Sequence, residues 1–143
     1  MRGRQLDLQV CIDKMEKGEG RLDPTIPARA LVDSGCTGSC IDEAFVNRHA
    51  IPTRKYIRPI GVFNADGTPN EAGIVTHYAT VGIEIQGHQE LLRLAVTKLA
   101  SSDLFLGYDW LMRHNPDIDW AKATLEFTRC PGDCGWMNVE WRK

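Results

Sequence analysis

The residues best suited to chemistry lie within residues 30–37 of the chain, Ala-Leu-Val-Asp-Ser-Gly-Cys-Thr. Asp33 directly follows an apolar stretch, and Ser34 and Gly35 come next. This order predicts a carboxylate on a tight turn at the edge of the core, because glycine allows close backbone approach and serine can close a turn with a hydrogen bond. A carboxylate held in this way is suited to general acid and general base chemistry.

Aspartic proteolysis is one reaction that uses such a carboxylate. Two carboxyl groups about 3 Å apart share one proton because both cannot ionise, so the pair activates a water molecule as a base and protonates the substrate carbonyl as an acid. Asp-Ser-Gly occurs once in the chain, so the second carboxylate would come from a second copy. Taken alone, the tripeptide is more often a solvated turn than a catalytic one.

Other side chains have the chemistry of metal ligands. Cys130 and Cys134 lie in a Cys-Pro-Gly-Asp-Cys turn, but a structural zinc site needs four ligands and no second Cys/His pair has matching spacing. His77, His88 and His114 show no shared partner in the sequence, so we expect structural or solvated roles for them. No metal and no organic cofactor is expected.

A cysteine nucleophile is a further alternative, since Cys36 and Cys40 precede His49. Cys36 follows the Asp-Ser-Gly turn, and Cys40 falls in what we expect to be the first turn of a helix. Buried, inert thiols are therefore the favoured interpretation. Trp110 and Trp120 flank a late helical stretch and are expected in the core.

The composition describes one ordinary domain. The chain has 143 residues, 43% of them hydrophobic, which is enough for a core of its own. Its 17 Lys and Arg residues against 19 Asp and Glu residues give a net charge of -2, so nucleic-acid binding is not expected. No apolar run reaches the ~20 residues that span a bilayer, and the five scattered cysteines agree with a reducing compartment. We therefore expect an intracellular protein that does not bind membranes.

The elements that must position Asp33 are mainly strands. Polar and apolar residues alternate, or short apolar runs occur, in eight segments that we expect to be extended: residues 6–12, 30–32, 57–63, 73–78, 81–85, 92–96, 118–120 and 125–127. Asp-Gly at residues 66–67 and Gln-Gly-His at residues 86–88 predict the turns of two hairpins, the first of which would protrude.

Two short helices complete the expected elements. One begins with the Ser-x-x-Asp pattern at Ser39 and ends before Pro52, and the other covers residues 109–114. The sequence after residue 128 has no clear period. We therefore expect a mainly β domain of residues 1–128, followed by a C-terminal tail or linker of residues 129–143.

Three segments of the sequence resemble the retropepsin-like aspartic proteases, most closely the protease domains of fungal long-terminal-repeat retrotransposons of the Gypsy type. They are residues 30–37, residues 105–111 (Phe-Leu-Gly-Tyr-Asp-Trp-Leu) and residues 114–120 (His-Asn-Pro-Asp-Ile-Asp-Trp), the last being typical of the retrotransposon branch. The resemblance extends over residues 6–127. It implies an all-β, closed-barrel-like acid protease fold with one or two short helices. It also implies a homodimeric aspartic endopeptidase that cleaves a peptide or its own polyprotein, in the cytoplasm or a virus-like particle.

The same resemblance implies roles for individual residues. Asp33 would be the catalytic aspartate, Ser34 would hydrogen-bond across a dimer axis, and Gly35 would offer its backbone to the substrate. Thr37 would complete the active-site turn. No metal or cofactor is implied, because the attacking group would be a water molecule held by two Asp33 carboxylates. A different class of function stays open, namely a catalytically silent or domesticated domain of this fold that serves dimerisation or peptide binding.

The hairpin around residues 64–73 resembles the flap that closes over a bound peptide in this family. The candidate substrate-binding residues at its tip are Asn64, Ala65, Asp66 and Gly67. The viral relatives have flap tips richer in glycine, so their flap contacts are not transferred to this chain.

Overall fold

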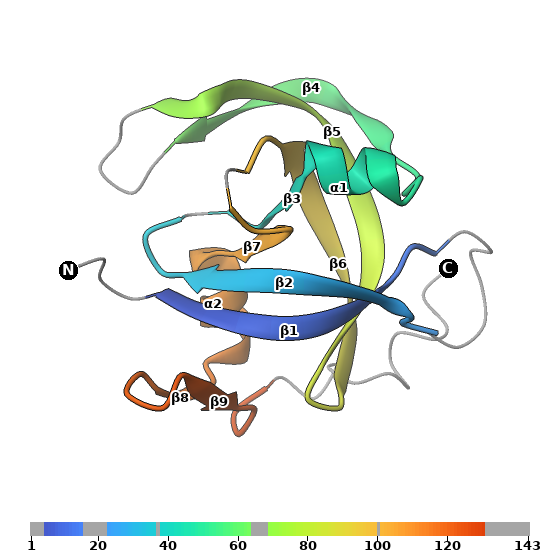
Figure 1. Ribbon diagram of the computed structural model, residues 1–143. Helices are drawn as coiled ribbons and strands as arrows, with labels where there is room; N and C mark the ends of the chain where they lie inside the picture. Colours follow the sequence, from blue (N-terminus) through green and yellow to red (C-terminus); the bar gives the residue numbers. More distant parts are fainter. Residues whose placement is uncertain (1–4, 16–22, 37, 64–68, 100, 131–143) are drawn as a thin grey trace.

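The structure, a computed structural model, describes residues 5–15, 23–36, 38–63, 69–99 and 101–130 (Figure 1). The strands in chain order are β1 (Gln5–Asp13), β2 (Ile26–Asp33), β3 (Cys40–Asp42), β4 (Arg54–Phe63), β5 (Pro69–Ile85), β6 (His88–Thr97), β7 (Leu104–Leu106), β8 (Asp117–Asp119) and β9 (Thr124–Glu126). The helices of the described residues are α1 (Glu43–Arg48) and α2 (Tyr108–His114).

Six of these strands form a closed barrel. Hydrogen-bonded neighbours follow the order β1-β2-β7-β3-β6-β5, and β5 returns to β1 where residues 82–84 pair with residues 11–13. Each strand of the ring therefore has a neighbour on both sides, which removes the open edges of a flat sheet. β4 pairs with β5 outside the ring. The predicted mainly β, closed-barrel fold with two short helices is confirmed.

The core fills the barrel with alternate residues of its strands. In β1, Leu6, Leu8, Val10 and Ile12 are buried, while the residues between them are exposed or half-buried, as the two-residue period of a strand requires. The other strands of the ring add Ala28, Ala30, Val32, Ile41, Val81, Ile83, Ile85, Leu94, Leu104 and Leu106. Burial of these apolar side chains is the main force that holds the barrel together.

The first half of β5 leaves the barrel and pairs with β4 in a long hairpin. β5 has 17 residues, and in Figure 1 this hairpin arches over the top of the barrel. Register shifts interrupt the pairing between Lys55 and Ile60, and such irregularities bend a hairpin. The predicted hairpin is confirmed. The tip residues Asn64, Ala65, Asp66 and Gly67 lie outside the described residues.

The expected helix start at Ser39 is wrong. Residues Cys40–Asp42 form β3, between β6 and β7, and α1 begins at Glu43. Asp42 is the N-cap, and its carboxylate accepts a hydrogen bond from the Phe45 N–H at 3.3 Å. Pairing of β3 with two neighbouring strands outweighs the local signal at Ser39, because strand formation depends on context more than helix formation does.

β2 is longer than the sequence indicated. The expected strand covered residues 30–32, but β2 begins at Ile26 and includes Pro27, which lies opposite Cys11 of β1. β7 pairs with β2 at residues 30–32. On the side of β2 opposite β1, Pro27 is therefore not part of this pairing. A proline is tolerated there because its missing N–H is not needed.

Several local predictions are confirmed. Gln86 and Gly87 have φ values of 51° and 83°, as the two-residue turn between β5 and β6 requires. Asn115 ends α2 in the left-handed conformation. Trp110 is buried as expected, whereas Trp120 is 40% exposed, so its assignment to the core is wrong. Among the described residues, no helix is long and apolar enough to cross a membrane.

Leu106 provides a test of this packing. It is 0% exposed and lies in β7, between β2 and β3. The Leu106→Ala variant should lose about 2–5 kcal/mol of unfolding free energy in urea denaturation, because it leaves a cavity in the core. Met112→Ala is the matched control, since Met112 is 65% exposed on α2, and should change stability by less than about 0.5 kcal/mol. Similar losses in both variants would contradict the described packing.

Candidate active site

Asp33 is the last residue of β2, at the point where the strand leaves the barrel. Its side chain accepts a hydrogen bond at Oδ1 from the Gly35 N–H at 2.8 Å, and its carbonyl accepts one from the Cys36 N–H at 3.1 Å. A Cβ at Gly35 would lie 3.2 Å from Asp33 Oδ1, so any larger residue there would crowd the carboxylate. The turn therefore orients the half-buried Asp33 carboxyl by its own backbone.

The turn after Asp33 packs on the end of β7. β7 lies between β2 and β3, parallel to the first and antiparallel to the second. The connection from β2 to β3 therefore meets the chain at Gly107, directly after the end of β7. A Cβ at Gly107 would lie 2.5 Å from the Cys36 carbonyl oxygen and 2.8 Å from that of Gly38. The Tyr108 N–H donates to the Cys36 carbonyl at 2.7 Å. Backbone thus contacts backbone, and only glycine fits at residue 107.

Ser39 and Asp109 complete this contact. The Ser39 hydroxyl donates to Asp109 Oδ1 at 2.8 Å and accepts from the Gly107 N–H at 3.0 Å. The Ser39 N–H donates to Asp109 Oδ2 at 3.3 Å. Since Ser39 is buried, these bonds hold the turn to the first residues of α2. The sequence analysis missed this pair, and the only local signal was an Asp two residues after Gly107.

The thiols near Asp33 have other partners. Cys36 Sγ donates to the Gly38 carbonyl at 3.2 Å. The hydrogen bond with Cys36, together with burial, raises the pKa of the Cys40 thiol, and the same bond lowers the pKa of Cys36. The His49 ring packs against Phe45, with 4.5 Å between ring centroids. The described contacts thus include no pairing of these thiols with His49, which agrees with the interpretation of Cys40 as an inert buried thiol.

The structure describes part of the candidate site. Ser34 and Gly35 lie in the turn after β2, whereas Thr37 and the flap-tip residues lie outside the described residues. A surface pocket of about 340 Å3 lies elsewhere, where α1 contributes Glu43 and Asn47 and β5 contributes His77. Asp33 does not line this pocket, so the pocket is not the candidate active site.

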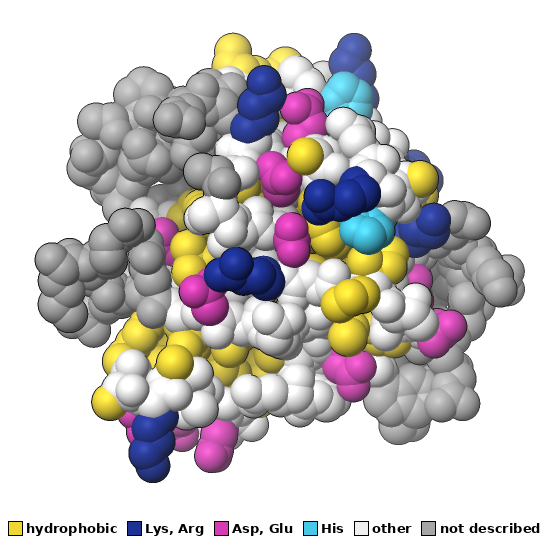
Figure 2. Space-filling view, viewed as in Figure 1, with side chains coloured by type: hydrophobic (Ala, Val, Ile, Leu, Met, Phe, Trp, Pro, Cys, Tyr) yellow, Lys and Arg dark blue, Asp and Glu magenta, His cyan; other side chains and the backbone are white. Residues whose placement is uncertain are grey.

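Figure 2 shows charges of both signs over one face of the molecule. Basic and acidic side chains are interspersed among apolar and uncharged ones. The described residues of this face therefore present no extended basic patch of the kind that binds a phosphate backbone.

A second polar cluster joins residues that the sequence analysis treated separately. His88 and His114 lie on either side of the Cys130 thiol and share Glu90 as a partner. The sequence alone showed no shared partner for these histidines, and the structure gives His88 and His114 two, Glu90 and Cys130. Burial lowers the pKa of the His88 imidazole. The residues that meet here are 16 to 42 positions apart in the sequence. No local sequence pattern can therefore reveal the cluster.

The molecule is similar to known proteins in sequence and fold. A family model of the PEG10/RTL1 protease domain matches residues 29–134. The fold is similar to that of the retroviral protease-like domain of Ddi1 from Leishmania major, with a TM-score of 0.55 at 17% identity over 88% of this chain and 89% of that one. It is also similar to EIAV protease in complex with the inhibitor HBY-793, with a TM-score of 0.53 at 22% identity over 77% of this chain and 88% of that one. The barrel therefore has a retropepsin-like fold.

Two glycines test the contact beneath the turn. Gly107→Ala should lower the unfolding free energy by about 1–3 kcal/mol, because the added methyl group would collide with two backbone carbonyls. Gly38→Ala is the matched control, since a Cβ at Gly38 meets nothing within 4 Å. Urea denaturation of both variants measures the difference. A Gly107→Ala protein as stable as the control would show that the turn does not pack on β7 as described.

Proposed function

The chain belongs to the family of PEG10/RTL1 protease domains, and from this premise we propose that it is an aspartic endopeptidase with Asp33 as its catalytic residue. One observation carries the proposal. The Asp33 carboxylate stands at the end of a buried strand, oriented by the Gly35 N–H at 2.8 Å, on a turn that packs against Gly107. Such a rigid support keeps a catalytic group in place without reorganisation during the reaction.

We propose that two copies of the chain form the active site. A dyad needs two carboxylates, and Asp-Ser-Gly occurs once per chain. A two-fold axis brings the same residue of each copy together, because an isologous interface is self-complementary. Two Asp33 side chains would then face each other across the axis, with the turn residues Ser34, Gly35 and Thr37 beside them.

The proposed reaction uses one shared proton. The ionised Asp33 removes a proton from a water molecule, whose oxygen bonds to the peptide carbonyl carbon. The protonated Asp33 of the other copy gives its proton to the carbonyl oxygen. Proton transfer to the amide nitrogen then allows the C–N bond to break, and a carboxylic acid and an amine leave.

The β4–β5 hairpin is proposed as the flap over the substrate. Its arch over the barrel (Figure 1) supports this role, since an extended peptide between a flap and a barrel can be held by backbone hydrogen bonds. Asn64, Ala65, Asp66 and Gly67 are the proposed contact residues. The polyprotein substrate and the origin in a fungal Gypsy-type retrotransposon are also proposals, supported by the motif at residues 114–120.

Asp33→Asn tests the catalytic assignment. The amide has the shape of the carboxyl group but cannot transfer the shared proton, so kcat/KM should fall by at least about 100-fold with no loss of fold. Cleavage of a mixed peptide library, followed by mass spectrometry, measures the effect, and circular dichroism checks the fold. Glu126→Gln removes an exposed carboxyl group in β9 and should leave cleavage unchanged.

Full activity in the Asp33→Asn variant would overturn the aspartic mechanism. A folded, dimeric wild-type chain that cleaves no peptide of the library would instead support the alternative of a catalytically silent binding module.

Mixing of variants tests the shared active site. A five-fold excess of Asp33→Asn chains should lower the activity of the wild-type chains about six-fold. With random pairing, about one in six wild-type chains has a wild-type partner, and the other pairs lack one carboxylate. The same excess of Glu126→Gln chains should not inhibit. Specific activity should also fall on dilution, as dimers dissociate. A sample that sediments as a pure monomer and still cleaves at full specific activity would contradict the dimer.

A further inference from the structure

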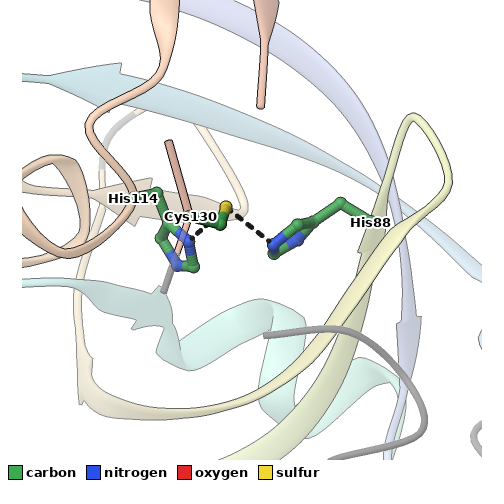
Figure 3. Close-up of side chains that lie close together, drawn as sticks. All are labelled: His88, His114 and Cys130. Atoms are coloured by element: carbon green, nitrogen blue, oxygen red, sulfur yellow. Dashed lines mark hydrogen bonds between the residues drawn. The ribbon is translucent and has the colours of Figure 1, made fainter. Parts of the chain in front are cut away.

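Three side chains with metal-binding chemistry converge in the structure (Figure 3). His88 begins β6, His114 ends α2, and Cys130 follows β9. Cys130 Sγ lies 3.3 Å from His88 Nε2 and 3.3 Å from His114 Nδ1. The three ligand atoms lie within 4.8 Å of one another. His114 is fully buried, and the other two are half-buried, so the cluster is part of the folded interior.

We propose that His88, His114 and Cys130 bind a zinc ion. Imidazole and thiolate are the ligands that zinc prefers in proteins. Tetrahedral zinc sites place neighbouring nitrogen and sulfur ligand atoms about 3.5 Å apart, close to the separations of 3.3 Å seen here. The three side chains supply three of the four ligands, which leaves one position for a water molecule.

Glu90 contacts the His114 ring at the nitrogen that does not face Cys130. Its Oε1 lies 3.0 Å from His114 Nε2, and its Oε2 accepts a hydrogen bond from Trp110 Nε1 at 3.0 Å. When Nε2 of His114 donates to this carboxylate, the Nδ1 lone pair of the same neutral ring points toward Cys130. A carboxylate that orients a histidine in this way is the usual outer partner of a zinc-bound imidazole.

His88 shows what a metal would contribute. Its Nδ1 is buried without a hydrogen-bond partner among the described residues and lies 3.7 Å from Glu90 Oε2. With a zinc ion on Nε2, His88 would carry its proton on Nδ1, on the side of the Glu90 carboxylate.

Aromatic rings pack around the proposed zinc site. The Phe127 ring stacks on His88, with 4.1 Å between centroids, and Trp110 packs against His114 at 4.8 Å. The ion would tie the segment after β9 to α2 and to β6. Since binding of a metal to the folded state alone stabilises that state, zinc should raise the melting temperature. This proposal is independent of proteolysis and of Asp33.

Metal content and melting temperature test the site. The 143-residue chain, purified under reducing conditions with zinc sulfate, should hold one zinc ion per chain by plasma mass spectrometry. Removal of zinc with a chelator should lower Tm by about 5 °C or more, and added zinc should restore it. Reduced protein that holds no zinc, with a Tm that does not respond to zinc, would overturn the proposal.

Variants identify the ligands. Cys130→Ser and His88→Gln should each lose the bound zinc and the response of Tm to zinc, whereas the controls Cys11→Ser and His77→Gln should keep both. Retention of zinc by Cys130→Ser would overturn the assignment. Cobalt replacement tests the wild-type chain directly, so the result does not depend on variants that fold poorly. A thiolate-to-cobalt charge-transfer band is expected, and a cobalt complex without that band would also overturn the proposal.

Discussion

The close contact between two backbone segments at Gly107 is the constraint on which the candidate active site depends. β7 runs between β2 and β3, so the turn after Asp33 must cross the end of β7. There the space for a Cβ at Gly107 is occupied by the carbonyls of Cys36 and Gly38. Backbone atoms cannot move aside as a flexible side chain can. The position of Asp33 is therefore set by the barrel itself, although Asp33 begins a turn.

α2 connects the Asp33 turn with the histidine and cysteine cluster. Asp109, in its first turn, binds Ser39 beside the Asp33 turn, while Trp110 and His114 bind Glu90. The helix has seven residues, too few to be stable alone, so it depends on these contacts at both ends. A metal ion at the cluster would therefore also stabilise the helix that helps to hold the candidate active site.

The proposed enzyme needs two chains because one barrel supplies one half of a symmetric site. Asp33 provides one carboxylate, and the described pocket beside α1 does not contain it. A substrate groove would then form between two barrels, with a hairpin from each. In that arrangement the barrel contributes rigidity, and the hairpin contributes a surface that can close over a peptide.

The sequence by itself determined the elements whose signals are local. Alternation predicted β1 and the strands of the β5–β6 hairpin, and turn chemistry predicted the β4–β5 hairpin, the bend at Gly87 and the end of α2, because these patterns act over a few residues. Asp33 stood out because Asp-Ser-Gly follows an apolar run. Only the tertiary structure decided which residues support it: pairing with neighbouring strands set the starts of β2 and α1, and barrel closure brought together Ser39 with Asp109 and His88 with His114 and Cys130. Contacts between residues far apart in the chain depend on the path of the whole backbone, so no local pattern records them.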